Sequence, residues 1–216
     1  MNILQSLNEL IFPSRCISCA ELGRSLCSQC RSQWNPHIYI TNVGQGHHQS
    51  LRVVSSVLYS PIAQKVILGA KESHLKRADL LVSEAISHSL QYLLREQWVD
   101  YLIPIPSRRS ATRKRGREFL AEITQPVSSE FSIPIARSLR HARKVRDQSG
   151  LDFENRWNNL DGAFVVEREH GLRGSAVLVD DLVTTGATLC EAARALRYAG
   201  IQVIGAVTAA LSQPLR

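Results

Sequence analysis

The sequence lacks the features of membrane, secreted and disordered proteins. None of its apolar runs approaches the ~20 residues that cross a bilayer. Residues 1–16 have no basic region ahead of their apolar part and include Glu9 within it, which is not the pattern of a signal peptide. With 44% hydrophobic and 21% charged residues, the composition favours a folded globular chain. We therefore expect a cytoplasmic protein with one substantial core and a small appended unit.

Cysteine is scarce, with five residues in a chain of 216, but four of the five occur in pairs. Cys16 and Cys19 form one CxxC pair, and Cys27 and Cys30 form the next. Four thiolates on two facing turns can surround one tetrahedral Zn²⁺ at about 2.3 Å, and the metal would supply the folding energy of a unit with almost no core. Disulfides are disfavoured in the cytoplasm, and a redox CxxC normally occurs singly on a βαβ unit. We predict that residues 1–36 form an N-terminal helix followed by a closed structural zinc site.

Positive charge exceeds negative charge, with 26 Lys and Arg against 19 Asp and Glu, and the excess is unevenly distributed. Clusters of cations attract polyanions, either a phosphorylated small molecule or a nucleic acid. The alternative is a solvated surface that only improves solubility. We favour polyanion binding because both clusters fall in predicted loops. The first cluster comprises Arg108, Arg109, Arg113, Lys114, Arg115 and Arg117, and the second comprises Arg137, Arg140, Arg143, Lys144 and Arg146.

Segments with strand and helix periodicity alternate along most of the chain, which predicts a mostly parallel sheet with helices on both faces. Residues 41–50 contain two glycines and few apolar side chains, so they are interpreted as a loop or linker. A helix is expected after Gly116, where Pro126 should break or kink it. The main domain is expected over residues 51–216. Its predicted strands cover residues 51–59, 99–106, 163–166, 175–180 and 201–210, and its predicted helices cover 61–70, 75–98 and 187–199.

The segment VLVDDLVTTGATL, residues 177–189, places two acids between a buried strand and a threonine-rich turn that opens a helix. Asp180 and Asp181 end the apolar run, and we expect the strand to end there because adjacent aspartates are poor residues for the interior of a strand. An apolar strand followed by acids is similar to a Walker B element, but the sequence contains no GxxxxGK[ST] loop to accompany it. Direct metal binding by the two acids lacks obvious co-ligands elsewhere in the sequence.

The turn itself indicates a phosphate site next to a diol site. Its backbone N–H groups and hydroxyls can converge on a phosphate at the helix start, and Gly186 lets the backbone approach closely. The two preceding carboxylates can accept hydrogen bonds from vicinal hydroxyls. A phosphate beside a diol describes a ribose 5-phosphate. The residues of the turn are Thr184, Thr185, Gly186, Ala187 and Thr188.

The segment over residues 177–189 resembles the signature of type I phosphoribosyltransferases, which bind 5-phosphoribosyl-1-pyrophosphate (PRPP). Other parts of the chain are similar to the ComF/GntX family of competence protein ComF-like proteins: the tetracysteine unit, IPIP followed by an Arg-rich turn, and RKVRDQSGLDFENRWNNLDGAF. The resemblance covers nearly the whole chain. It implies a type I phosphoribosyltransferase fold, preceded by a small double zinc-ribbon-like module with four cysteines.

The resemblance also implies roles for individual residues. Asp180 and Asp181 would hold the ribose 2- and 3-hydroxyls and stabilise positive charge on the sugar during catalysis. The turn over residues 184–188 would cradle the 5-phosphate. Mg²⁺ would bridge the pyrophosphate and the sugar hydroxyls, with the two acids helping to orient it.

A second set of residues would serve the pyrophosphate. Ser107, Arg108 and Arg109 follow the IPIP strand and take the place of the pyrophosphate loop. Arg143 and Lys144 lie where such enzymes have a mobile loop that closes over PRPP. The implied reaction is displacement at C1 of the ribose, with these cations stabilising the departing pyrophosphate. No set of residues in the sequence indicates the acceptor.

Two classes of function are compatible with the resemblance. One is a PRPP-dependent transferase, and the other is a binding module that senses PRPP or a nucleotide, or handles single-stranded DNA in natural transformation. Competence or DNA-processing proteins would be partners of the second. Residues 116–119, GREF, depart from the family pattern Gly-Phe-Asn-Gln, and residues 68–71, LGAK, lack the usual aromatic. Phe119 is the aromatic residue nearest the first basic cluster, whereas single-strand binders usually stack several aromatics on bases.

Overall fold

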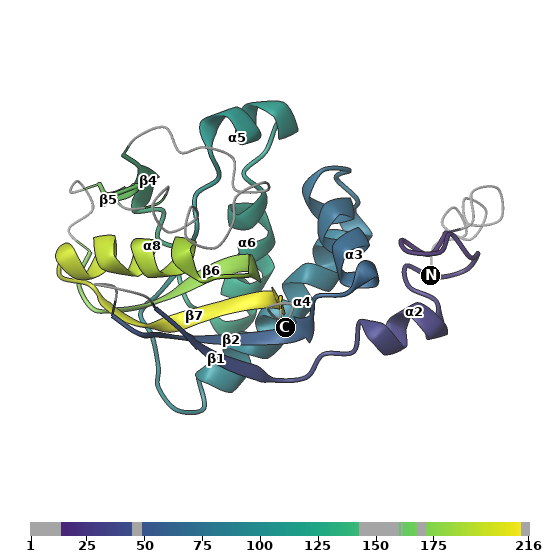
Figure 1. The fold of residues 1–216 in the computed structure, drawn as a ribbon, viewed down its shortest axis with the longest axis horizontal. Coiled ribbons are helices and arrows are strands. Elements are labelled where there is room, and N and C mark those ends of the chain that lie inside the picture. The colour runs from purple at the N-terminus through teal and green to yellow at the C-terminus, as the bar shows by residue number, and fades with distance from the viewer. Residues whose placement is uncertain (1–13, 45–48, 143–159, 161, 168–171, 213–216) are drawn as a thin grey trace.

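The computed structural model describes residues 14–44, 49–142, 160, 162–167 and 172–212. Within these residues a five-stranded sheet has the order β1-β2-β7-β6-β3 (Figure 1). Four neighbouring strands are parallel, and β1 pairs antiparallel with β2 at one edge. This order confirms the mostly parallel sheet. The strands are β1 (Tyr39–Val43), β2 (Leu51–Leu58), β3 (Tyr101–Pro104), β6 (Ser175–Val183) and β7 (Gln202–Leu211).

Helices cover both faces of this sheet. α4 packs against α6, β2 and β7, whereas α8 packs against β6 and β7 from the other side (Figure 1). The connections from β2 to β3 and from β6 to β7 cross the sheet in opposite directions. Right-handed crossovers therefore place their helices on opposite faces. The helices of this domain are α3 (Pro61–Lys71), α4 (Lys76–Leu93), α5 (Arg109–Arg115), α6 (Phe119–Phe131) and α8 (Ala187–Tyr198).

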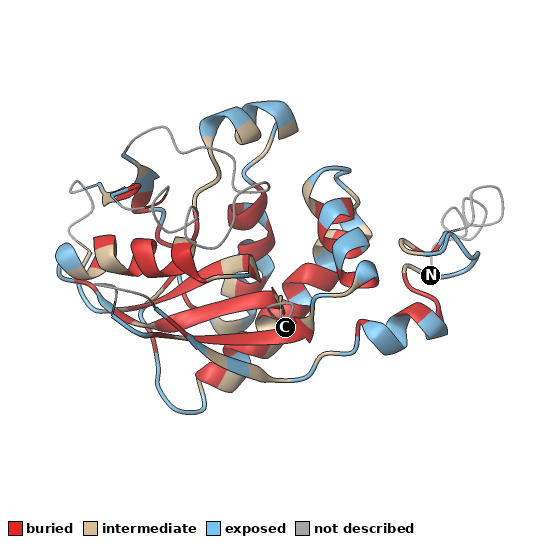
Figure 2. Ribbon diagram, viewed as in Figure 1, coloured by how far each residue is buried: buried red, intermediate tan, exposed pale blue. Residues whose placement is uncertain are grey.

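The core lies between the sheet and these helices, as the buried strands in Figure 2 show. Residues 176–179 of β6 are fully buried, and so are residues 206, 207, 209 and 210 of β7. Strands covered on both faces lose the alternation of polar and apolar side chains. This explains why the sequence presents β6 as a continuous apolar run that ends at Asp180.

The chain also extends the sheet beyond β3. An isolated parallel bridge joins Leu102 to Ile135, after the crossover through α6. α6 continues through Pro126, so of the two expected effects of this proline, a break or a kink, the break does not occur. Ile123 and Val127 on either side are buried, and their packing offsets the lost backbone hydrogen bond. A second small sheet pairs β4 (Leu139–His141) with β5 (Phe164–Val166).

Two segments expected to be loops are regular structure. β1 includes residues 41–43 of the expected linker, because β2 supplies its backbone partners along that edge. α5 occupies most of the first basic cluster and ends at Gly116, whose φ of 70° forms a left-handed helix cap. None of the helices in the described ranges is long and apolar enough to cross a membrane.

Candidate functional site

Two of the turns singled out in the sequence leave the same edge of the sheet. β3 and β6 are parallel neighbours, with Pro104 paired to Val179. The N–H of Ile105 donates to the carbonyl of Val179 at 2.9 Å. Ser107 follows shortly after β3 ends, and Asp180 comes directly after Val179. Ligands of open α/β sheets bind at such carboxyl ends of strands, so the fold brings the expected pyrophosphate turn next to the acidic pair.

The two acids at this edge have different environments. Asp181 is buried, and both of its carboxylate oxygens accept hydrogen bonds from Lys71 Nζ at 3.0 Å. Asp180 is half-buried, and its Oδ1 accepts a hydrogen bond from the Asp181 N–H at 2.9 Å. Each carboxylate therefore has a polar partner. Lys71, the last residue of α3, was not among the predicted site residues.

These neighbouring charges shift two pKa values. Burial, followed by the charge of Asp181, raises the pKa of Asp180 well above its ordinary value, against the opposing effect of Lys71. Burial lowers the pKa of Lys71, but the carboxylates of Asp181 and Asp180 outweigh it, and the pKa is raised overall. The Lys71 ammonium is therefore charged at neutral pH, and Asp180 takes up a proton at a higher pH than an exposed aspartate does.

The threonine turn connects the acidic pair to α8. Gly186 is the N-cap residue of α8, and the N–H of Ala187 donates to Thr185 Oγ1 at 3.3 Å. Thr184 is exposed, and Thr185 and Thr188 are half-buried, so their hydroxyls lie near the surface. The structure thus places the turn at the start of a twelve-residue helix, where backbone N–H groups favour an anion.

His141 of β4 contacts the expected pyrophosphate turn from the other side. Its Nε2 lies 3.0 Å from the carbonyl oxygen of Pro106, immediately before Ser107. Burial lowers the pKa of His141, although the contact with Pro106 opposes this shift. A neutral imidazole donates this hydrogen bond through its Nε2–H group. The sequence offered no signal for this positioning contact, because the partner is a backbone carbonyl.

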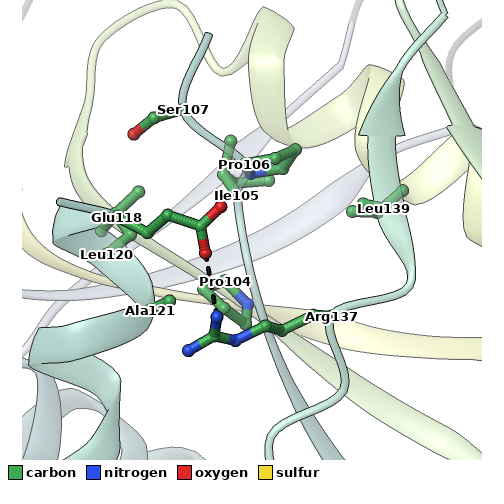
Figure 3. A pocket seen from close by; sticks show the side chains of 9 residues that line it. All are labelled: Pro104, Ile105, Pro106, Ser107, Glu118, Leu120, Ala121, Arg137 and Leu139. Atoms are coloured by element: carbon green, nitrogen blue, oxygen red, sulfur yellow. Dashed lines mark hydrogen bonds and ion pairs between the residues drawn. The ribbon is translucent and has the colours of Figure 1, made fainter. Parts of the chain in front are cut away.

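A cavity of about 120 Å³ adjoins the same turn (Figure 3). The Glu118 carboxylate and the Arg137 guanidinium meet across it at 3.0 Å. Both side chains are more than half exposed, so this ion pair is a weak contact that a ligand can displace. The cavity is lined by Pro104, Ile105, Pro106, Ser107, Glu118, Leu120, Ala121, Arg137 and Leu139.

Arg117 of the first basic cluster is a structural residue. Its side chain is 7% exposed, and its two terminal nitrogens donate to the Asp79 carboxylate at 2.7 and 2.8 Å. It also donates to the carbonyl of Ala70 at 2.6 Å. Arg117 therefore ties the end of α3 to the start of α4 and does not face solvent. The prediction that the whole cluster faces a polyanion was wrong for this residue.

The other cations of the two clusters differ in their surroundings. Arg115 pairs with Glu72 at 2.7 Å, and Arg140 pairs with Glu167 at 3.3 Å. Arg108 is half-buried at the start of α5. The cations of α5 that remain exposed are Arg109, Arg113 and Lys114. The predicted loop residues Arg143 and Lys144, with Arg146, lie outside the described residues.

The four paired cysteines form one cluster. The sulfur atoms of Cys16, Cys19, Cys27 and Cys30 all lie within 4.8 Å of one another, and none of the four is in a disulfide. Burial opposes ionisation of Cys16, but backbone N–H groups outweigh it and lower its pKa to about 6. Four soft sulfur donors that converge on one point fit a tetrahedral Zn²⁺. The spacing of the cysteines thus correctly predicted their convergence.

The cysteine cluster rests on α3. Lys65 Nζ donates to the carbonyl of Ser18 at 2.7 Å, between the first pair of cysteines. The Ile17 side chain lies against Gly69, on the same helix. The second pair of cysteines brackets the start of α2 (Ser28–Gln33). The cysteine unit therefore contacts the helix that carries Lys71.

Known proteins resemble this chain in sequence and fold. Residues 115–214 match the model of the phosphoribosyl transferase domain family. Over 109 residues, 49% of this chain, the sequence is 33% identical to competence protein F of Haemophilus influenzae, and the match spans about half, 47%, of that protein. It is 27% identical over 161 residues to orotate phosphoribosyltransferase of Corynebacterium glutamicum, covering 63% of this chain and 79% of that protein. A crystal structure of adenine phosphoribosyltransferase covers 87% of this chain and 91% of its own, with 10% identity and a TM-score of 0.47.

The family match to residues 115–214 and the strand order together support the class of protein. The chain contains a phosphoribosyltransferase domain with the type I fold. Its tetracysteine cluster and its match to competence protein F support a ComF-like phosphoribosyltransferase protein.

Proposed function

We propose that this chain binds PRPP, or another ligand that carries ribose 5-phosphate, where β3 and β6 end. The observation that carries this proposal is the convergence at one edge of an acidic pair, a helix-opening threonine turn and the Ser107 turn. Asp180 and Asp181 would hold the ribose hydroxyls. Residues 184–188 would bind the 5-phosphate, and Ser107 would face the pyrophosphate.

The electrostatics of this edge suit the departure of pyrophosphate. Arg108 and Arg109 follow Ser107, and the exposed Arg109 is free to turn toward an anionic group. Displacement at C1 of the ribose makes the sugar more positive and the leaving group more negative. Carboxylates beside the sugar and guanidinium groups beside the leaving group stabilise both changes. Arg143 and Lys144 would add further positive charge.

The expected Mg²⁺ has few protein ligands here. In the described part of the chain, the cysteine cluster is the one group of three or more His, Cys, Asp or Glu residues that meets the geometry of a metal site. Asp181 is already engaged by Lys71, and Asp180 accepts a backbone hydrogen bond. Mg²⁺ accompanying PRPP would therefore be held mainly through oxygens of the ligand. Zn²⁺ would be held by the four cysteines in a structural role.

The protein would act in the cytoplasm, either as a transferase or as a PRPP or nucleotide sensor. Hydrolytic or transfer chemistry needs an acceptor beside C1 of the ribose. The cavity next to Ser107 supports the transferase, because its apolar walls and displaceable Glu118–Arg137 pair suit a small planar acceptor. A sensor would need the ribose phosphate site alone.

Handling of single-stranded DNA is a second candidate function. It is supported by the exposed cations Arg109, Arg113 and Lys114 on α5, next to the Ser107 turn. Such cations contact a nucleic acid backbone and make binding strongly dependent on salt. The match to competence protein F supports a role in DNA uptake, with DNA-processing proteins as partners.

A PRPP titration by calorimetry tests the ribose phosphate site. Wild type should bind PRPP, and Asp181→Asn should weaken binding about tenfold or more, because an amide is a poorer acceptor for a diol than a carboxylate. Glu84→Gln on α4 is a control of equal charge change, and it should bind as wild type does. Release of pyrophosphate with candidate acceptors then separates a transferase from a sensor. Single-stranded DNA binding that survives Asp181→Asn would place DNA on a separate surface, and absence of PRPP binding by wild type would contradict the site.

A further inference from the structure

The structure joins a cation to the acidic pair across a long sequence separation. Lys71 and Asp181 are 110 residues apart, yet Lys71 Nζ lies 3.0 Å from both carboxylate oxygens. The Asp181 side chain is 6% exposed and the Lys71 side chain is 28% exposed. Lys71 is therefore the more exposed partner of the contact. An ammonium has three N–H donors, and Asp181 accepts two of them, which leaves one for another acceptor.

Several contacts hold Lys71 in this position. Arg117 donates to the carbonyl of Ala70, the residue before Lys71, at 2.6 Å. Arg117 is itself anchored by Asp79 of α4. The Phe119 ring lies 5.9 Å from Lys71 Nζ, within reach of a cation–π contact. Lys71 is thus a built part of the site, unlike a surface lysine that samples many rotamers.

This placement addresses an electrostatic problem of the site. PRPP and ribose 5-phosphate are anions, and two carboxylates beside them repel the ligand that their hydrogen bonds attract. A cation close to the carboxylates reduces this repulsion, and either Mg²⁺ or a basic side chain can provide it. Lys71 already contacts Asp181, whereas no described cluster of acids near this edge meets the geometry of a metal site.

We propose that Lys71 supplies the positive charge that the acidic pair needs to accept an anionic sugar phosphate, so that PRPP binds with little dependence on Mg²⁺. This inference rests on the proposed ribose phosphate site. Lys71 holds the Asp181 carboxylate in one orientation through two hydrogen bonds, and its remaining N–H group contacts an oxygen of the ligand. Mg²⁺ carried by PRPP adds to this charge and does not replace it.

The test compares PRPP binding in buffer with excess Mg²⁺ and in buffer depleted of divalent cations by resin. A chelator is avoided because it would remove zinc from the cysteine cluster. The wild-type affinity should differ by less than about threefold between the two buffers, whereas Lys71→Met should bind at least about tenfold more weakly without Mg²⁺ and recover part of this loss with it. Lys71→Arg should keep most of the affinity. Lys76→Met removes an exposed lysine five positions away and should match wild type in both buffers.

The possible failures are distinct. A wild-type affinity that falls more than about tenfold without Mg²⁺ would refute the role of Lys71 while leaving the ribose phosphate site intact. Equal behaviour of Lys71→Met and Lys76→Met would refute it as well. Wild type that binds PRPP in neither buffer would refute the proposed site, and this inference with it. The wild-type comparison needs no substitution, so it decides the question even where Lys71→Met fails to fold.

Discussion

A β-carbon added to Gly186 would lie 2.3 Å from the Cβ of Val43, well inside van der Waals contact. Gly186 precedes α8 with a φ of 79°, and Val43 is the last residue of β1. The edge strand therefore packs directly against the threonine turn. The glycine is required by its left-handed backbone and by this neighbour, in addition to any close approach of a ligand.

Gly186→Ala should destabilise the protein by about 3 kcal/mol, because it combines the clash with Val43 and an unfavourable φ. Urea denaturation measures this loss. Gly200→Ala is the matched control, since Gly200 has a φ of 85° but a β-carbon added there would have no atom within 4 Å. Gly200→Ala should lower the free energy of unfolding by about 1 kcal/mol, because only the unfavourable left-handed φ opposes it. Equal losses in the two variants would show that Val43 does not restrict the turn.

Asp180→Asn should raise the melting temperature at neutral pH. Because the folded pKa of Asp180 is raised, its protonated form contributes stability that is present below the unfolded pKa of about 4 and is lost as pH rises through the folded pKa. Asparagine mimics the protonated acid and keeps the Oδ1 acceptor for the Asp181 N–H. Each 1 kcal/mol added to the free energy of unfolding raises the melting temperature by about 2–4 °C in a chain of this size.

Melting curves from acidic to neutral pH check this expectation. The difference between Asp180→Asn and wild type should shrink as the pH falls toward 4, where wild-type Asp180 is itself protonated. If the difference in melting temperature between Asp180→Asn and wild type stays constant across this pH range, the substitution acts through packing and not through charge. The same variant should weaken PRPP binding, because the neutral amide replaces a carboxylate acceptor.

Arg117→Met should destabilise the fold by about 3 kcal/mol or more, because it leaves the mostly buried Asp79 carboxylate without its partner. Arg113→Met removes an exposed cation of the same cluster and should change stability by less than about 0.5 kcal/mol. Denaturant unfolding of the two variants measures the difference. Arg113→Met should instead reduce the salt dependence of any binding to single-stranded DNA. Similar stability losses in both variants would contradict the conclusion that Arg117 is a structural residue and Arg113 an exposed one.

The purified protein should contain about one zinc per chain, as a tetrahedral four-thiolate site requires. Elemental analysis should find none in the Cys16→Ser/Cys27→Ser variant, whose unfolding should begin at the N-terminal unit. Cys190→Ala is the control, because Cys190 is buried on α8 and outside the cluster. It should retain the metal. Zinc loss in the control, or full zinc in the double variant, would contradict the assignment.

Features that depend on neighbouring residues were predictable from the sequence. The apolar run, the turn and the helix over residues 177–198 follow from a buried strand pattern and helical spacing. The prediction that the strand ends at the acidic pair was wrong, because β6 continues through Asp180 and Asp181 to Val183, where β7 supplies its backbone partners. The cysteine cluster follows from two CxxC pairs. The mostly parallel sheet follows from the alternation of strands and helices.

Features that depend on distant partners were not predictable. Arg117 and Arg113 occupy similar positions in one basic cluster, and the difference between them comes from Asp79, 38 residues away. Residues 41–43 of β1 were assigned to a loop or linker, because a short polar edge strand is defined by its neighbour β2. Gly186 could be assigned to ligand binding, but its contact with Val43 could not be foreseen.

The chain's local pattern alone determined that it folds as alternating strands and helices with four converging thiols and a phosphate-type turn, since each of these depends on spacing within a few residues. Only the tertiary structure decided which charges are available at that turn. Lys71 reaches Asp181 because α3 ends beside the carboxyl edge of β6, and Arg117 is withdrawn because α4 presents Asp79 to it. Ionic contacts act through space, so their partners are set by how the elements pack.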